Sequence, residues 1–235
     1  MTTQSSHTEF TEAGKAVAVV PLKKLNHAKS RLAPILDSEQ RRQFALSMLE
    51  DVLGTLRDSE AITTILVVTK EAGIVSKLNL QGLDIWTDSS DTDLNSALRA
   101  ATTHVRRHYG EQPLLIIPAD VPLVTKPDIK GILSLGKDVD PPVVVAAPSD
   151  NGGTSALLRI PPNALGVQFG PSSFKNHQML ARESDVTFLA YQSPTLGLDI
   201  DTPDDVKALL QYPADNIAIE YLQQSKAIQS HGWKP

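Results

Sequence analysis

Two apolar runs of this chain end in carboxylates. Residues 114–120 read LLIIPAD, and residues 196–201 read LGLDID. A buried strand that ends in unpaired negative charge is costly unless something compensates that charge. Asp120, Asp199 and Asp201 offer the hard oxygen ligands that Mg²⁺ prefers, and in phosphoryl-transfer sites one or two carboxylates hold Mg²⁺ together with substrate phosphates. This pattern predicts a metal-dependent enzyme that acts on a nucleotide.

A cluster of cations follows the first strand-like run. Residues 21–32 read PLKKLNHAKSRL and bring Lys23, Lys24, Lys29 and Arg31 into nine residues. Arginine can grip a phosphate through two hydrogen bonds, and lysine supplies a compact charge. A loop of this kind is suited to cradle a triphosphate. The alternative is an ordinary solvated basic loop, and the cradle is favoured because this loop and the carboxylates should share one rim of the sheet.

Two glycine-bearing segments lie in the second half of the chain. Residues 150–156 read DNGGTSA, and residues 169–174 read FGPSSF. Consecutive glycines permit close approach of the backbone to a ligand, and Thr154, Ser172 and Ser173 offer hydroxyls and amides for phosphate or carboxylate oxygens. The alternative is that both segments are ordinary turns.

Other polar residues have simpler explanations. Either aspartate of the run LDID could cap the helix that Pro203 should open, as could Thr202. His104 and His108 stand four apart on an expected helix, but no third zinc ligand lies nearby, so they are expected at the surface. His177 follows FGPSSF and is expected either at the rim of the site or as a residue that orients this segment.

Apolar, β-branched runs alternate along the chain with segments of helical period. Strands are expected at residues 15–20, 62–69, 83–86, 114–117, 142–147, 156–160, 187–191 and 196–200. Helices are expected at residues 38–57, 74–78, 94–109, 128–135 and 203–210, and within 217–228.

This alternation predicts an α/β fold in which a single doubly wound, mostly parallel sheet carries helices on both faces. In such Rossmann-like sheets, ligands bind outside the carboxyl ends of the strands where the strand order switches, and Asp120 and Asp201 should lie there. The expected organisation is a disordered N-terminus (1–14), one domain (15–211) and a C-terminal tail (212–235) that contains the weakly amphipathic helical segment.

Composition narrows the class of protein. The 235 residues include 22 Lys and Arg against 27 Asp and Glu, which gives a net charge of -5. The chain therefore lacks the excess of positive charge with which proteins neutralise the phosphates of nucleic acids. The absence of cysteine excludes disulfides, thiolate zinc sites and cysteine nucleophiles. No apolar stretch approaches the ~20 residues that span a bilayer. A cytoplasmic enzyme without nucleic-acid or membrane partners is expected.

The motifs in their order carry a resemblance. PLKKLNHAKSRL, DLNSAL, PADVPL, DNGGTSALL, FGPSSF and LDIDTPDD together resemble the guanylyltransferases of coenzyme F420 biosynthesis over residues 17–210. These enzymes are a branch of the nucleotidyltransferases, are related to molybdenum-cofactor nucleotidylyltransferases, and have the nucleotide-diphospho-sugar transferase fold. The resemblance implies that phosphoenolpyruvate or 2-phospho-L-lactate attacks the α-phosphate of GTP and that pyrophosphate leaves, with two Mg²⁺ ions as cofactors.

The resemblance also implies roles for particular residues. The metal ligands would be Asp120, Asp199 and Asp201, with Asp120, Lys29 and Arg31 as the catalytic residues. The phospho-acid would be held by Gly153, Thr154, Gly170, Ser172 and Ser173. The nucleotide would be held by Pro21, Lys23, Lys29 and Asn95. The chain departs from the family pattern at Ser155, where Asn is expected, and it lacks the glycine-rich nucleotide loop of many nucleotidyltransferases.

Three other functions are considered. The D-x-D pattern of residues 199–201 also suits a metal-dependent glycosyltransferase, but such an enzyme often has an aromatic-rich acceptor cleft, and only 5% of this chain is aromatic. A nucleotidyltransferase for another phospho-acid, such as 3-phosphoglycerate, is the closer alternative. A non-catalytic phosphometabolite sensor would have little use for three convergent carboxylates.

The reactive product of guanylyl transfer should pass to a downstream deazaflavin transferase. The sequence leaves the acceptor, the base and the oligomeric state open.

Overall fold

The computed structural model describes residues 14–22, 24–25, 28–78, 83–87, 93–213, 215–225, 228–229 and 233. Residues 1–13 of the expected disordered N-terminus lie outside this range, and so does Lys23 of the basic loop.

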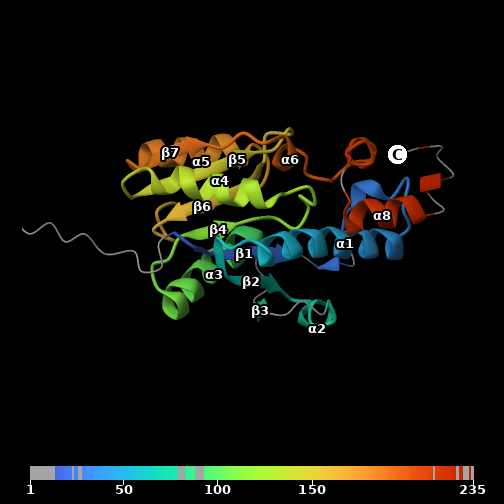
Figure 1. Cartoon of the computed structure of the whole chain (residues 1–235), viewed down its shortest axis with the longest axis horizontal. Helices are drawn as coiled ribbons and strands as arrows, with labels where there is room; N and C mark the ends of the chain where they lie inside the picture. The colour runs from blue at the N-terminus through green and yellow to red at the C-terminus, as the bar shows by residue number, and fades with distance from the viewer. Residues whose placement is uncertain are drawn as a thin grey trace, which may run out of the picture.

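Seven strands form one sheet in the order β3-β2-β1-β4-β6-β5-β7 (Figure 1). Neighbouring strands are parallel except that β6 runs antiparallel to both β4 and β5. Strands β2 and β3 follow β1 in sequence and lie on one side of it, and β4 lies on its other side. The strand order therefore switches between β1 and β4. The strands are β1 (Ala16–Leu22), β2 (Ile62–Thr69), β3 (Leu83–Trp86), β4 (Leu114–Ile116), β5 (Val143–Pro148), β6 (Thr154–Ile160) and β7 (Thr187–Ala190).

Helices cover both faces of this sheet, as the doubly wound prediction requires. Alternate side chains of β1 point to opposite faces of the sheet and belong to different hydrophobic cores. Ala18 lies in the core that includes side chains of α1, α4, α7 and α8, and Val19 lies in the core that includes side chains of α3 and α5. The helices are α1 (Ser38–Arg57), α2 (Ala72–Val75), α3 (Leu94–Tyr109), α4 (Lys126–Lys137), α5 (Ser173–Glu183), α6 (Pro194–Gly197), α7 (Pro203–Leu209) and α8 (Ile217–Gln224), with a 3₁₀ turn at Ser30–Leu32.

The C-terminal helix α8 packs along α1 (Figure 1). The carboxylate of Asp51 accepts hydrogen bonds from the backbone N–H groups of Ile217 and Ala218, at 2.8 and 2.9 Å, and so caps the start of α8. The rings of Phe44 and Tyr221 stack with their centroids 6.2 Å apart. The helix expected within residues 217–228 is therefore part of the folded body.

The predicted strand at residues 196–200 is wrong. Ser193 caps a short helix, α6, and Pro194 occupies its first turn, so residues 194–197 are helical. The backbone after α6 makes single hydrogen bonds to two loops: Ile200 N–H donates to the carbonyl of Asp120, and Asp150 N–H donates to the carbonyl of Gly197. These isolated bonds do not form a strand ladder.

No helix is predicted at residues 173–183, where the structure has α5. The buried positions of α5 are Ser173, His177 and Ala181, which follow one another at intervals of four residues. Because two of these three side chains are polar, apolar periodicity does not reveal the buried face of this helix.

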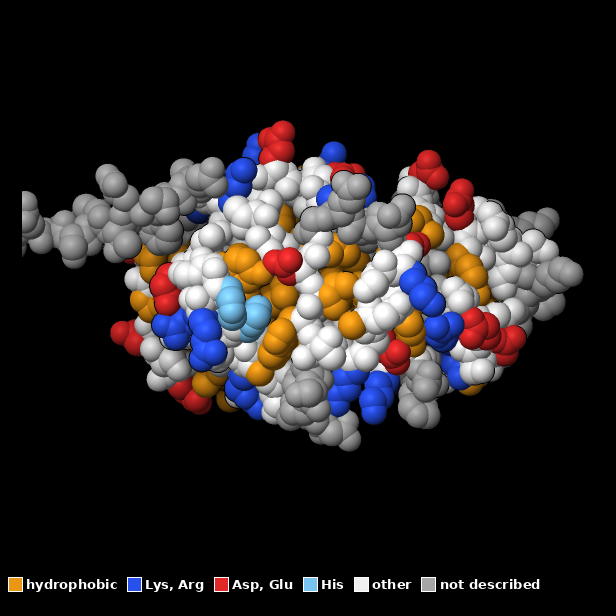
Figure 2. Space-filling model, turned by 90° about the horizontal axis from the view of Figure 1, so that it is seen from below, with side chains coloured by type: hydrophobic (Ala, Val, Ile, Leu, Met, Phe, Trp, Pro, Cys, Tyr) orange, Lys and Arg blue, Asp and Glu red, His pale blue; other side chains and the backbone are white. Residues whose placement is uncertain are grey.

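Charge is mixed on the surface. Figure 2 shows one face of the molecule, on whose described part Lys and Arg side chains lie interspersed with Asp and Glu. No helix in the part of the chain that the structure describes combines the length and the apolar character needed to cross a membrane.

Asp128 on α4 anchors the segment that leads to Asp199 and Asp201. Its side chain accepts hydrogen bonds from the hydroxyls of Thr125, Ser193 and Thr195, at 2.6, 2.6 and 2.7 Å. Burial raises the pKa of Asp128, but these hydrogen bonds outweigh burial and leave the pKa below its usual value. An ionised carboxylate therefore fixes the start of α6.

Replacement of Asp128 by Ala should lower the free energy of unfolding by about 2–3 kcal/mol, because three hydroxyls lose their common acceptor. Asp128→Asn should cost less, since the amide oxygen still accepts. Urea unfolding at pH 7 measures both variants, with the exposed Asp138→Ala on the same helix as the control. Equal stability of Asp128→Ala and Asp138→Ala would show that the network contributes nothing.

Candidate active site

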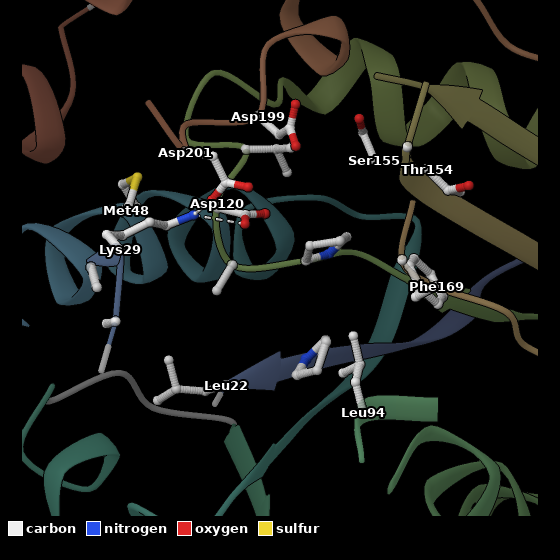
Figure 3. A pocket seen from close by; sticks show the side chains of 18 of the residues that line it. Leu22, Lys29, Met48, Leu94, Asp120, Thr154, Ser155, Phe169, Asp199 and Asp201 are labelled. Carbon is white, nitrogen blue, oxygen red and sulfur yellow. Dashed lines mark hydrogen bonds and ion pairs between the residues drawn. The ribbon is translucent and has the colours of Figure 1, made fainter. Parts of the chain in front are cut away.

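A cavity of about 840 Å³ opens at the carboxyl ends of β1 and β4 and at the start of β6. This is the expected rim, next to the switch in strand order. Of the residues predicted for the site, those that line the cavity are Pro21, Lys29, Arg31, Asp120, Gly153, Thr154, Gly170, Ser173, Asp199 and Asp201. Figure 3 shows three regions of its wall: the charged residues, the hydroxyls with Phe169, and an apolar floor at Leu22 and Leu94.

Lys29 links two of the predicted metal ligands (Figure 3). Its Nζ lies 2.8 Å from Oδ2 of Asp120 and 2.8 Å from Oδ1 of Asp201. Burial lowers the pKa of Lys29, but the charges of the two carboxylates outweigh burial and raise the pKa above its usual value. The ammonium is therefore charged, and it bridges two segments that are far apart in the sequence.

Asp199 is held separately. Asn151 Nδ2 donates to both of its carboxylate oxygens, at 2.9 and 2.7 Å. Burial raises the pKa of Asp199, the hydrogen bonds from Asn151 offset part of this rise, and the charges of Asp120 and Asp201 add to it. Lys29 thus pairs with two of the three carboxylates, and the amide of Asn151 holds the third.

The described residues contain no group of three or more His, Cys, Asp or Glu side chains arranged to hold a metal ion. The alternative role of the aspartates as helix caps is also absent, because Thr202 caps α7 in a capping box with Asp205. Asp199 and Asp201 therefore line the cavity and do not cap the helix.

The two glycine-bearing segments meet at one wall of the cavity. The hydroxyl of Ser173, at the start of α5, donates to Thr154 Oγ1 on β6 at 3.0 Å. Gly170 has φ 137°, a conformation that only glycine adopts readily, and the preceding Phe169 faces the cavity. These segments are more than ordinary turns, since both contribute to a single polar wall.

His177 lies behind this wall and has no exposed surface. Its Nε2 accepts from the backbone N–H of Gln168 at 2.9 Å, so in the neutral ring Nδ1 carries the proton and donates to Thr154 Oγ1 at 3.1 Å. Thr154 and Ser173 then retain one hydroxyl proton between them for a ligand oxygen. Of the two roles considered for His177, the structure supports orientation of the segment.

Two of the predicted residues do not line the cavity. The side chain of Asn95 binds the backbone of Phe169 at both its N–H and its carbonyl, at 2.7 and 2.9 Å, and thereby fixes the loop that carries the aromatic ring. Ser172 is exposed and adopts the left-handed conformation with φ 55° at the start of α5. Both residues support the wall from outside.

Sequence reasoning assigned no role to Ser155 and Asn151. Ser155 is the extra residue of a bulge between β5 and β6, because Ala147 pairs with Ala156 and Pro148 pairs with Thr154. Ser155 is 1% exposed, and its buried hydroxyl has no hydrogen-bond partner among the described residues. Figure 3 shows it on the wall between Asp199 and Thr154. The one signal in the sequence was that Ser155 departs from the family pattern.

The expected surface position of the histidine pair is confirmed for His108, which is exposed, whereas His104 is partly buried. Their rings stack with centroids 4.1 Å apart, and His104 also stacks on Trp86. Neither histidine lines the cavity.

Two solved structures share this fold. The chain is similar to a putative nucleotide-diphospho-sugar transferase from Desulfovibrio desulfuricans G20, with a TM-score of 0.74 and 13% identity over 93% of this chain and 98% of that one. A nucleotidyl transferase from Methanothermobacter gives a TM-score of 0.60 with 15% identity, over 90% of this chain and 99% of the other.

Residues 16–230 match the family described as guanylyl transferase CofC like, and the chain belongs to this family. A 2-phospho-L-lactate guanylyltransferase of Methanothermobacter thermautotrophicus is 31% identical over 210 residues, which are 89% of this chain and 91% of that protein. A phosphoenolpyruvate guanylyltransferase of Roseiflexus castenholzii is 34% identical over 214 residues, which are 89% of this chain and 97% of the relative.

Removal of the His177 imidazole should destabilise the fold in a pH-dependent way. His177→Phe leaves the Gln168 N–H without its acceptor and Thr154 without one donor, at a cost of about 2–3 kcal/mol at pH 7.5. Burial, helped by the charge of Arg159, lowers the pKa of His177 to about 4. Because this lies below the ordinary value of about 6.5, neutral His177 stabilises the fold above that pH, and the contribution is lost as the pH falls from about 6.5 to 4.

Urea unfolding between pH 7.5 and 4.5 tests this prediction. The wild type should lose stability with falling pH more steeply than His177→Phe, because only in the wild type does unfolding release a neutral ring that can take up a proton in this range. His108→Phe, which replaces an exposed imidazole, should follow the wild-type curve. Parallel curves for the wild type and His177→Phe would contradict the assignment.

Proposed function

We propose that this protein transfers GMP from GTP to the phosphate of a phosphorylated three-carbon acid, phosphoenolpyruvate or 2-phospho-L-lactate, and releases pyrophosphate. Family membership over residues 16–230 supports the reaction class, and the printed functions of relatives at 31% and 34% identity support the substrates. The observation that carries the proposal is one cavity with a cationic loop, a carboxylate cluster and a hydroxyl wall. The cationic loop suits the triphosphate, the carboxylate cluster suits a metal ion, and the hydroxyl wall suits the phospho-acid.

The reaction needs positioning more than proton transfer. An oxygen of the acceptor phosphate forms a bond to the α-phosphorus of GTP, while the bond from this phosphorus to the bridging oxygen of the β-phosphate breaks and its electron pair leaves with pyrophosphate. The attacking phosphate is already anionic at neutral pH, so no general base is required. This explains why the neutral, buried His177 can serve the site without acting on a proton of the substrate.

Each wall of the cavity has a proposed task. Arg31 and Lys29 bind the triphosphate, since both side chains line the cavity beside the carboxylates. The spare hydroxyl proton of Thr154 and Ser173, with the backbone at Gly153 and Gly170, holds the phospho-acid. The apolar residues Leu22, Leu94 and Phe169 pack against the guanine. Asn95 acts on the nucleotide side by fixing the loop of Phe169.

Mg²⁺ is proposed as the cofactor, with Asp120, Asp199 and Asp201 as its ligands. The donor chemistry suits such an ion: all three are hard oxygen donors that line the cavity, and two of them already bind one cation, the ammonium of Lys29. When bound, Mg²⁺ would offset the repulsion between the acceptor phosphate and the triphosphate. The D-x-D alternative is not favoured, because the relatives are guanylyltransferases.

The product joins two phosphates through an anhydride and is reactive. A downstream enzyme that transfers the phospho-acid to a deazaflavin is proposed as a transient partner, which would receive this product before water does.

Asp120→Asn should reduce guanylyl transfer by roughly 10²–10³-fold, the usual scale for loss of one electrostatic group at a reacting centre. Release of pyrophosphate from GTP and Mg²⁺ is measured with phosphoenolpyruvate, 2-phospho-L-lactate and 3-phosphoglycerate in turn. Asp58→Asn, which changes an exposed carboxylate that pairs with Arg57, should retain full activity. Near-normal transfer by a folded Asp120→Asn protein would overturn the role of Asp120, and no release with any acid would overturn the proposed function.

Ser155→Ala should raise the KM for the phospho-acid about three- to tenfold, because the unpartnered hydroxyl on the cavity wall loses a hydrogen bond to the bound acid. Unfolding stability without substrates should not fall, since this hydroxyl has no protein partner to lose. Ser225→Ala is the matched control, because it removes another buried, unpartnered hydroxyl that does not line the cavity. An unchanged KM in Ser155→Ala would show that the hydroxyl does not contact the acid.

A further inference from the structure

The Lys29 side chain occupies the position where a cation shared by Asp120 and Asp201 would lie. Its Nζ is 2.8 Å from one oxygen of each carboxylate, and the lysine side chain is only 10% exposed, against 30% and 38% for the two aspartates. A second cation bound to the same two oxygens would be in contact with the ammonium. The ammonium and a divalent ion therefore exclude each other at these oxygens.

The backbone at Lys29 is compatible with this exchange. Lys29 has φ 49° and ψ 44°, the left-handed conformation that a residue with a side chain seldom adopts, and it stands immediately before the 3₁₀ turn Ser30–Leu32. The contacts that offset this backbone strain in the described structure include the two ion pairs. Loss of these ion pairs therefore also removes contacts that help to hold Lys29 in this conformation.

We propose that Lys29 is the exchangeable occupant of a cation site formed by Asp120 and Asp201: it neutralises the two carboxylates in the substrate-free protein, and it yields them to a divalent ion as its ammonium moves to a polyphosphate in the cavity. This inference rests on the proposed function for the polyphosphate. The competition between Lys29 and a divalent ion does not require it.

The exchange couples the two ligands. A divalent ion that binds alone displaces the ammonium and leaves it buried without a carboxylate partner. A polyphosphate that binds alone draws Lys29 away, and Asp120 and Asp201 lose the ammonium that bridges them. When both bind, every charge has a partner, so each ligand raises the affinity for the other by the same factor. Asp199 stays outside the exchange while Asn151 holds both of its oxygens.

Binding of Mn²⁺ alone, without GTP or acceptor, tests the competition. Lys29→Met should bind Mn²⁺ about tenfold more tightly than the wild type in a titration followed by electron paramagnetic resonance, which corresponds to about 1.4 kcal/mol. Arg31→Gln is the matched control, because it removes one positive charge that also lines the cavity but leaves both ion pairs in place. Its affinity for Mn²⁺ should change less than threefold.

Thermal unfolding provides a second readout, in case loss of the bridging ammonium weakens the variant. Mn²⁺ should raise the Tm of Lys29→Met by several degrees more than it raises that of the wild type, and Asp120→Asn combined with Lys29→Met should abolish this difference. Unchanged or weaker Mn²⁺ binding by Lys29→Met, an equal gain in Arg31→Gln, or an unfolded Lys29→Met that Mn²⁺ does not restore would each overturn the proposal. Since these assays contain no substrate, they succeed or fail independently of guanylyl transfer.

Discussion

The organising constraint of this molecule is the accumulation of negative charge at one partly buried point. Asp120, Asp199 and Asp201 converge on the cavity from two distant parts of the chain, and carboxylates so placed repel one another unless cations or donors intervene. Lys29 and Asn151 supply this compensation within the protein. Three neighbouring carboxylates do not help a fold to be stable. Their presence therefore favours a role in binding positively charged ligands.

The surrounding structure holds these groups in place with few contacts. Ile200 N–H donates to the carbonyl of Asp120 at 2.9 Å and so joins the two acidic segments through the backbone. Thr202 caps α7 and sets where the chain after Asp201 becomes helical, while Asp128 fixes the start of α6. Hydrogen bonds between loops and helix starts thus position the aspartates at the rim of the cavity. The sheet beneath them contributes the hydrophobic core.

Much of this arrangement follows from local pattern. The bounds of β2, β3 and α3 agree with apolar periodicity, and the local pair Asp37 and Gln40 forms a capping box at the start of α1. The common rim of loop and carboxylates follows from the parallel order of strands. The partner of Lys29, the buried position of His177 and the antiparallel course of β6 depend on tertiary contacts, which periodicity within one segment does not contain.

The β5–β6 hairpin has a consequence for how such an enzyme could diversify. Because β6 runs against its neighbours, its first residues, rather than its last, reach the rim, and the short connection from β5 delivers Asn151, Gly153, Thr154 and Ser155 as one continuous stretch. The cationic loop after β1 belongs to a different part of the chain. Substitutions within this single hairpin can therefore alter part of the cavity half assigned to the acid, to which Gly170 and Ser173 also belong, without a change in the cationic loop.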